Sequence, residues 1–229
     1  MSPVRQGDPG TRRYTQKIIY ELANSIRERD IITYEHSRRV AVYVNRLARY
    51  MGWSRSSARD LALAGLIHDL GKTWMQNDLL HKDSALSVPE RSQMERHPAI
   101  AARILLTCGI PDTLVSAVLH HHEAFDGHGY PDQLAGEAIP LGARLLSVAD
   151  VYDALTSERP YKHAIDDASA CEYLRSQSGV CFDPSVVTPF LELLDQKPDF
   201  RLMPRVCPLP LPPTPRPAWI RHDVFDLWY

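Results

Sequence analysis

The chain has 229 residues, of which 44% are hydrophobic and 24% charged, and its formal net charge at pH 7 is -2. This length suffices for one full hydrophobic core, and a charge so close to zero gives no indication that the chain binds a nucleic-acid polymer. No apolar run reaches the roughly 20 residues that a membrane helix needs, and no apolar core follows the polar first residues, so we expect a cytoplasmic protein without a membrane segment.

Helical periodicity dominates the chain and predicts an all-α fold. Within 14–26 the apolar residues recur at steps of three and four, which marks one buried helix face. Thr33 is expected to cap a second helix that ends at Gly52, and Ser54 to cap a third that runs to Gly71. Further helices are predicted at 97–106, 111–122, 141–155, 167–175 and 184–194.

Two segments depart from this pattern. Residues 125–138 are rich in Gly, Pro and Asp, and we expect them to form an ordered loop over a histidine cluster. Residues 208–217 are mostly proline and favour polyproline II. The predicted division is a polar N-terminal segment at 1–13, a domain at 14–195 and a proline-rich C-terminal tail at 196–229. That tail either packs its aromatic residues on the domain or docks on a partner.

Side chains that can bind metal ions stand within or beside apolar helices. Asp150 lies in the otherwise apolar run 145–151, where a carboxylate is unfavourable unless it is paired or bound to a cation. His68 and Asp69 likewise follow the apolar run 64–67. A single histidine on a helix is usually structural, but several such residues together favour metal binding. Imidazole and carboxylate suit first-row transition metals.

Cationic residues accompany these potential ligands. Lys72 lies one helical turn after His68, where its ammonium group could meet a metal-bound phosphate. Arg159 and Lys162 follow Asp150 and either line the mouth of a site or belong to a solvated helix end. Two metal ions roughly 3.5–4 Å apart could clamp a phosphate and activate water for in-line attack.

These motifs resemble those of the HD-GYP phosphodiesterases of the HD superfamily. The resemblance covers about 14–194 and follows the family's order of elements. It rests on HSRRVA at 36–41, AGLIHDLGK at 64–72, HP at 97–98, HHEAFDGHGYP at 121–131, VADVYDALTSERPY at 148–161 and SGVCFDP at 178–184.

The resemblance implies an HD-superfamily helical bundle with an ordered GYP loop. The GYP loop corresponds to the predicted loop at 125–138, which contains Gly, Tyr and Pro at 129–131. The resemblance also implies an enzyme that hydrolyses cyclic di-GMP to pGpG or GMP through attack by a metal-activated hydroxide. The implied metal ligands are His36, His68, Asp69, His97, His121, His122 and Asp150, with Asp69 bridging. The implied catalytic residues are Asp69 and Lys72, and the implied substrate contacts are Lys72, Tyr130, Arg159 and Lys162.

The resemblance also implies two divalent transition-metal ions, iron or manganese before zinc or nickel. Some relatives hold a third metal through a Glu at the position that is Ile32 here, so two ions are expected. Because imidazole binds metal only when neutral, metal affinity and activity are expected to fall below about pH 6.

Two alternatives remain open at the level of sequence. The chain could be an HD-type phosphohydrolase for another nucleotide, since one scaffold hosts several chemistries. It could also be a low-turnover module that binds a cyclic dinucleotide or a cyclase, with the GYP loop or the proline-rich tail contacting a protein partner. The GYP loop and the pair Arg159 and Lys162 favour the cyclic-dinucleotide enzyme, and the full ligand set argues against a pure binding module.

Overall fold

The computed structural model describes residues 9–82, 84–158 and 163–196, most of which are helical. The helices are α1 (Pro9–Arg29), α2 (Ile31–Tyr50), α3 (Arg55–Ile67), α4 (Asn77–Leu80), α5 (Val88–Met94), α6 (His97–Thr107), α7 (Asp112–Leu119), α8 (Leu141–Thr156), α9 (Asp167–Ser176) and α10 (Pro184–Gln196), with 3-10 helices η1 (Leu70–Trp74) and η2 (Gly136–Ala138). Within the described ranges there is no β-strand, and β pairing is limited to one isolated bridge between Ser178 and Phe182. The predicted all-α fold is confirmed.

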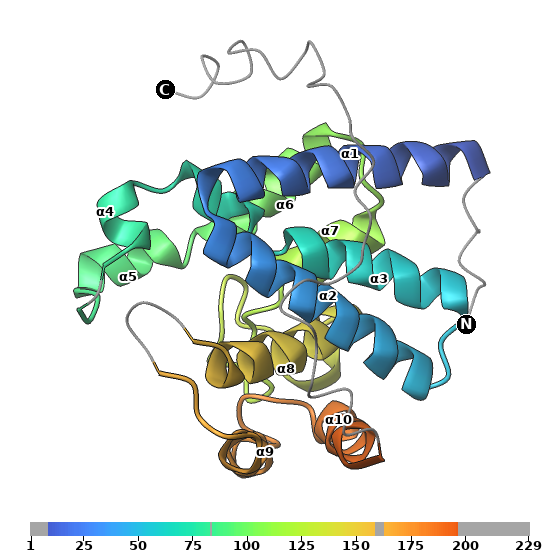
Figure 1. Ribbon diagram of the computed structural model, residues 1–229, viewed down its shortest axis with the longest axis vertical. Coiled ribbons are helices and arrows are strands. Elements are labelled where there is room, and N and C mark those ends of the chain that lie inside the picture. Colours follow the sequence, from blue (N-terminus) through green and yellow to red (C-terminus); the bar gives the residue numbers. More distant parts are fainter. Residues whose placement is uncertain (1–8, 83, 159–162, 197–229) are drawn as a thin grey trace.

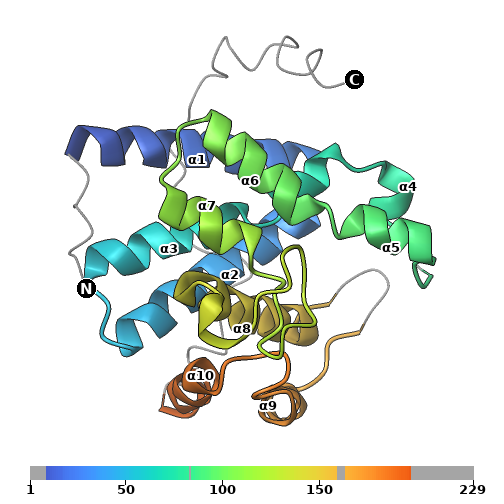
Figure 2. The same ribbon diagram turned by 180° about the vertical axis from the view of Figure 1, so that it is seen from behind.

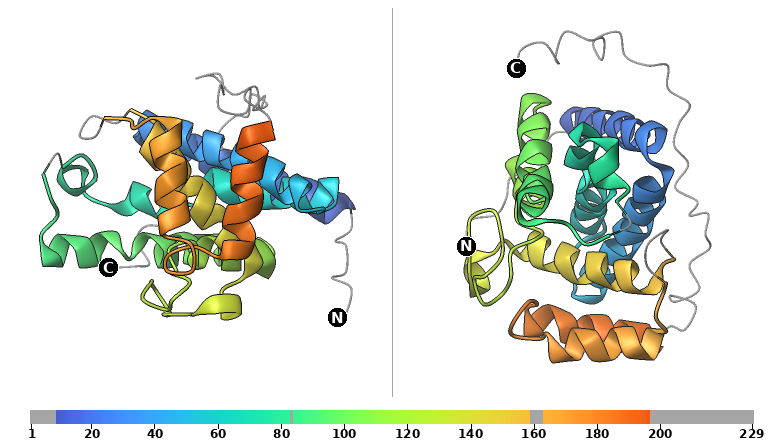
Figure 3. Two further views of the ribbon diagram at one scale, coloured as in Figure 1. Left: turned by 90° about the horizontal axis from the view of Figure 1, so that it is seen from below. Right: turned by 90° about the vertical axis from the view of Figure 1, so that its left-hand side faces the viewer.

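Helix α2 occupies the centre of the bundle. It packs against α1, α3 and α8, and its most extensive contact is with α3 (Figure 1). Seen from behind, α7 covers the other side of α3, α6 packs against α7 and η1, and the loop between α7 and α8 lies beside α8 (Figure 2). Helices α9 and α10 form a layer beyond α8 (Figure 3).

The amphipathic pattern of the first helix is confirmed. Ile18, Ile19, Leu22, Ala23 and Ile26 are all buried in the common core. The helix itself begins at Pro9, earlier than its apolar face. The division of the chain at 1–13, 14–195 and 196–229 stays a prediction.

Two predicted boundaries in the first half of the chain, the start of α2 and the end of α3, are wrong. The N-cap of α2 is Asp30, not Thr33, because one carboxylate oxygen of Asp30 accepts the N–H of Ile32 at 2.8 Å and the other accepts the Thr33 hydroxyl at 2.6 Å. Helix α3 has the predicted cap, with the Ser54 hydroxyl accepting from the N–H of Ser57, but it ends at Ile67. The chain then tightens into η1.

Helix α7 also ends sooner than predicted, at Leu119, so that three consecutive histidines stand in the turn that follows it. Among the described residues, no helix combines the length and the apolar character needed to cross a bilayer.

Candidate metal centre

The seven predicted ligands come together from separate parts of the chain. They lie on α2, at the end of α3, before η1, at the start of α6, after α7 and on α8. Their ligand atoms form three overlapping groups, and within each group the atoms lie within 4.8 Å of one another. The groups are His97, His121 and His122; His36, His68 and Asp69; and His68, His121 and Asp150.

Three of the histidines are oriented in one common way. Nδ1 of His68 lies 2.7 Å from the carbonyl oxygen of Gly65. In the same way, Nδ1 of His97 lies 2.9 Å from the carbonyl oxygen of Met94, and Nδ1 of His121 lies 2.6 Å from that of Val118. In each case the partner is three residues earlier in the chain. Because a carbonyl oxygen only accepts hydrogen bonds, Nδ1 carries the proton and Nε2 keeps its lone pair. These lone pairs are directed at the shared centre.

His36 is oriented by a side chain instead. Its Nδ1 lies 2.7 Å from Oδ2 of Asp153, which is fully buried on α8. The guanidinium group of Arg39 holds the same carboxylate through two hydrogen bonds of 2.7 and 3.0 Å. The other ring nitrogen of His36, Nε2, lies 2.8 Å from Oδ1 of Asp150. A carboxylate that fixes the second nitrogen of a histidine is a common arrangement around protein-bound metals.

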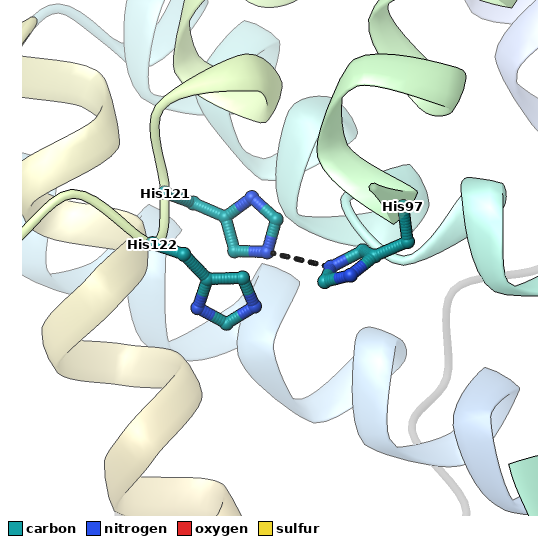
Figure 4. Close-up of side chains that lie close together, drawn as sticks. All are labelled: His97, His121 and His122. Atoms are coloured by element: carbon teal, nitrogen blue, oxygen red, sulfur yellow. Dashed lines mark hydrogen bonds between the residues drawn. The ribbon is translucent and has the colours of Figure 1, made fainter. Parts of the chain in front are cut away.

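The centre contains atoms that a cation would satisfy. Nε2 of His97 and Nε2 of His121 face each other at 3.4 Å, although neither nitrogen has a proton to donate (Figure 4). Nε2 of His68 and Oδ1 of Asp69 are buried without a hydrogen-bond partner. Buried polar atoms are rarely left unpaired. A donor set of imidazoles and carboxylates with these open atoms fits first-row transition-metal ions.

Asp69 lies between the two halves of the centre. Its Oδ1 is 3.3 Å from Nε2 of His97, and its Oδ2 is 3.5 Å from Nε2 of His68 and 4.0 Å from that of His36. Oδ2 also accepts a hydrogen bond of 2.7 Å from Nζ of Lys72. The two oxygens of this carboxylate thus face different sets of histidines.

Burial keeps several of the imidazoles neutral. It lowers the pKa of His97 to about 3, with a further contribution from the charge of Lys72, and it lowers the pKa of His121 to about 4. Burial also lowers the pKa of His122. Since a histidine must be neutral to bind a metal ion, these three side chains are ready to bind at neutral pH.

His36 behaves in the opposite way. Burial alone would lower its pKa, but hydrogen bonds to Asp150 and Asp153 outweigh this effect and raise the pKa to about 8. Burial would raise the pKa of Asp69, but the charge of Lys72 and the neighbouring histidines lower it well below its usual range. Burial would raise the pKa of Asp150, but the short contact with His36 and the charges of the neighbouring histidines lower it below its usual range. Both carboxylates are therefore ionised.

A cavity of about 230 Å³ opens onto this centre. Among the residues that line it are His36, Asp69 and His97, together with the predicted substrate contacts Lys72 and Tyr130. The other two predicted contacts, Arg159 and Lys162, lie outside the described residues. The cavity wall also contains residues that the sequence did not single out for contact with a ligand, namely Asp30, Ile32, Thr33, Leu80, His81 and Met94.

The loop between α7 and α8 carries Tyr130 to the cavity. Its phenol ring lies 5.0 Å from the ring of His122, and burial raises its pKa, so the hydroxyl keeps its proton at neutral pH. Gly129 permits the loop to fold back on its own first residues, because a Cβ at this position would lie 2.1 Å from the backbone nitrogen of Ala124. The loop bonds to the α9–α10 connection as well, through the N–H of Phe125 and the carbonyl of Cys181.

Glu123 fixes the base of this loop. Its carboxylate is buried and accepts the backbone N–H groups of Asp132 at 2.7 Å and Leu134 at 3.1 Å. Glu123 also forms a further group of potential ligand atoms with His120 and Asp132, which bond to each other at 2.9 Å. His120 was not predicted to be a ligand, and these contacts describe a loop anchor.

Two residues that shape the centre were not predicted from the sequence. Asp153 and Arg39 orient His36, and neither was assigned a role. A signal was available for Asp153, because it follows Asp150 by three residues in the same helix and is another carboxylate among apolar neighbours.

The chain is similar to known proteins in its sequence and in its fold. Residues 21–186 match the family of HD domains. The chain is 43% identical over 164 residues to the cyclic di-GMP phosphodiesterase PA4108 of Pseudomonas aeruginosa, which covers 71% of this chain and 39% of that protein. It is 35% identical over 187 residues to the 3'3'-cGAMP-specific phosphodiesterase 2 of Vibrio cholerae, which covers 81% of this chain and 36% of that protein.

Among solved structures, the cyclic GMP-AMP-specific phosphodiesterase V-cGAP3 of V. cholerae superposes with a TM-score of 0.61. The sequence identity is 20%, and the match covers 81% of this chain and 50% of the other, so this likeness shows the fold. The chain spans less than half the length of the two curated relatives. With the family match over most of its length and the motifs in place, the chain belongs to the HD domain family, in its HD-GYP branch.

Proposed function

We propose that this chain is a metal-dependent phosphodiesterase that hydrolyses cyclic di-GMP to pGpG, GMP or both. The observation that carries the proposal is the meeting of seven potential metal ligands at a cavity that is also lined by Lys72 and Tyr130. The relative named as a cyclic di-GMP phosphodiesterase, at 43% identity, supports the same substrate.

The proposed cofactor is a pair of divalent transition-metal ions, iron or manganese before zinc or nickel. His36, His68 and Asp150 would hold one ion, and His97, His121 and His122 the other. Asp69 would contact both, because its two oxygens face different histidines. When bound, the ions supply Lewis-acid stabilisation of phosphate charge and activation of water.

Side chains that line the cavity would bind the substrate and stabilise its charge. The ammonium group of Lys72, which rests on Asp69, is placed to stabilise negative charge on a phosphodiester that enters the centre. The protonated hydroxyl of Tyr130 can donate a hydrogen bond to the same ligand. We propose Arg159 and Lys162 as further contacts to phosphates or bases.

The proposal includes a location for the protein and a contact surface for a protein partner. Cyclic dinucleotides are intracellular molecules, so the proposed location is the cytoplasm. A protein partner would contact the GYP loop or the proline-rich tail.

A second candidate substrate is 3'3'-cGAMP, because a relative at 35% identity is named as specific for it. The two dinucleotides share their phosphodiester groups and differ in one base. The chemistry of the centre therefore applies to both, and contacts to the bases decide between them.

The test is turnover of each dinucleotide by purified protein loaded with Mn²⁺ or Fe²⁺, with products separated by chromatography. We expect cyclic di-GMP to be hydrolysed at least as fast as 3'3'-cGAMP, and Asp69→Ala to abolish product. Preferential hydrolysis of 3'3'-cGAMP would establish the second candidate. Binding of metal without turnover of either compound would favour another nucleotide substrate, and binding of a dinucleotide without turnover would favour the binding module.

A further inference from the structure

A second concave surface lies away from the metal centre, among α1, α2 and α3. It is a groove of about 580 Å³, more than twice the volume of the cavity at the metal centre. Its floor is apolar and includes Ala41, Leu63 and Leu66, which are buried side chains of α2 and α3. Figure 1 shows these two helices side by side, with α1 lying above them and in contact with both.

The rim of the groove is strongly basic. Arg46 and Arg49 of α2 and Arg55 and Arg59 of α3 line it, and all four are exposed. Among the described residues that line the groove, none is acidic. The nearby carboxylate of Asp60 is held by Arg12 of α1. An occupant should therefore combine apolar groups with negative charge.

The described chain stops next to this groove. Gln196, the last residue of α10, donates a hydrogen bond of 3.1 Å to the hydroxyl of Tyr50, the last residue of α2. Tyr50 directly follows Arg49 on the rim. The sequence then continues from 197 to 229. Polyproline II extends a chain by about 3.1 Å per residue, so residues 208–217 alone could span roughly 30 Å, which is enough to reach the groove from Gln196.

The last part of that sequence has the required chemistry. Residues 222–229 read HDVFDLWY, with two acidic residues, three aromatic ones and no Lys or Arg. The basic residues of the tail, among them Arg216 and Arg221, all precede this stretch. The proline-rich run 208–217 has no acidic residue to complement the rim.

We propose that residues 222–229 dock in this groove of the same chain. Asp223 and Asp226 lie against the arginines of the rim, and Phe225 and Trp228 cover the apolar floor. The groove is formed by α2 and α3, and these helices also carry His36 and lead to His68. The docked tail thus braces the helix pair that holds one half of the metal centre, without entering the cavity there.

The test uses the full chain with photoreactive p-benzoylphenylalanine in place of Phe225. After illumination, mass spectrometry identifies the crosslinked peptides. We expect most crosslinks to join the tail to 41–66 of the same chain. Crosslinks that join two chains, or that spread over the surface without preference for 41–66, would overturn the proposal.

Charge reversal provides a second readout on the same protein. Arg55→Glu with Arg59→Glu should lower the crosslink yield roughly five- to tenfold, because attraction becomes repulsion. Adding Asp223→Arg and Asp226→Arg should restore the yield, which a merely unfolded variant could not do. The matched control is Arg103→Glu with Arg175→Glu, which changes the net charge equally on α6 and α9 and should leave the yield unchanged. Docking by charge would be contradicted if the Arg55 and Arg59 variant gave the same crosslink yield as the Arg103 and Arg175 control. It would also be contradicted if the added substitutions at Asp223 and Asp226 failed to restore the yield.

Discussion

Nδ1 of His36 lies 2.7 Å from Oδ2 of Asp153, although the two residues are 117 positions apart in the chain. The contact joins the N-terminal part of α2 to α8 and leaves Nε2 of His36 directed at Asp150. One buried carboxylate therefore decides how a proposed metal ligand is oriented. Arg39 neutralises that carboxylate and holds it through two hydrogen bonds.

We predict that Asp153→Asn weakens metal binding without removing any proposed ligand. The amide keeps the shape of the side chain but loses the charge that polarises His36, so Mn²⁺ affinity at one of the two positions should fall about 10- to 100-fold. Calorimetric titration of metal-free protein measures this. The control is Asp167→Asn, which removes a carboxylate that bonds to the hydroxyl of Tyr152 instead. Equal affinities in both variants would contradict the role of Asp153.

Lys72 should matter for turnover more than for metal binding. Its ammonium group lies 2.7 Å from Asp69 and faces the cavity, where it can stabilise charge on the reacting phosphate. Lys72→Gln should lower kcat roughly 100-fold while leaving two metal equivalents bound. Lys82→Gln is the matched control, since Lys82 pairs with Glu90 instead. Loss of bound metal in Lys72→Gln would show that the lysine has a structural role.

The metal-free protein should be most stable near pH 6.5, because stability falls on either side of this value. The pKa values of His97, about 3, and His121, about 4, lie below the unfolded value near 6.5, so the unfolded chain binds more protons and stability is lost as the pH falls below 6.5. Each residue contributes a slope of up to about 1.4 kcal/mol per pH unit. The raised pKa of His36, about 8, stabilises the fold below pH 6.5, and this contribution is lost as the pH rises through 8.

Urea unfolding of protein treated with a chelator, at a series of pH values, measures this profile. The control variant is His128→Asn, because His128 is exposed on the loop and should not change the slope. A free energy of unfolding that stays constant between pH 5 and 6.5 would contradict the assignment of neutral, buried histidines.

Glu123→Gln should loosen the loop that carries Tyr130. Both carboxylate oxygens accept backbone N–H groups, and an amide can replace only one of these acceptors. We expect a loss of about 1–3 kcal/mol in the free energy of unfolding and faster hydrogen exchange at Asp132 and Leu134. Glu137→Gln, in the same loop but exposed, is the control. Unchanged exchange at both amides would show that Glu123 does not anchor the loop.

The proposed ligands could be found from sequence because polar residues within apolar helices are conspicuous. Asp150 and His68 stand out for this reason, and the structure brings both to one centre. Their orientation could not be predicted. The Nδ1 contacts depend on backbone carbonyls at particular turns, and that of His36 depends on a residue from a distant helix.

The predictions of helix boundaries were wrong for a related reason. Asp30 and Thr33 are both good helix caps, and sequence alone does not say which of two such residues begins the helix. Lys72 was placed one α-helical turn after His68, whereas the chain enters a 3-10 helix there and its ammonium group rests on Asp69. Packing against other parts of the chain determines where a helix begins and whether it continues as an α-helix or a 3-10 helix. Gly71 is an example, since a Cβ there would lie 2.0 Å from the carbonyl oxygen of His97.

The most direct test of the account is a titration of metal-free protein with Mn²⁺ while cyclic di-GMP turnover is followed. We predict that two equivalents bind, that turnover rises as the second one binds, and that Asp69→Asn binds less metal and yields no product. Full turnover by protein from which all metal has been removed would contradict the account.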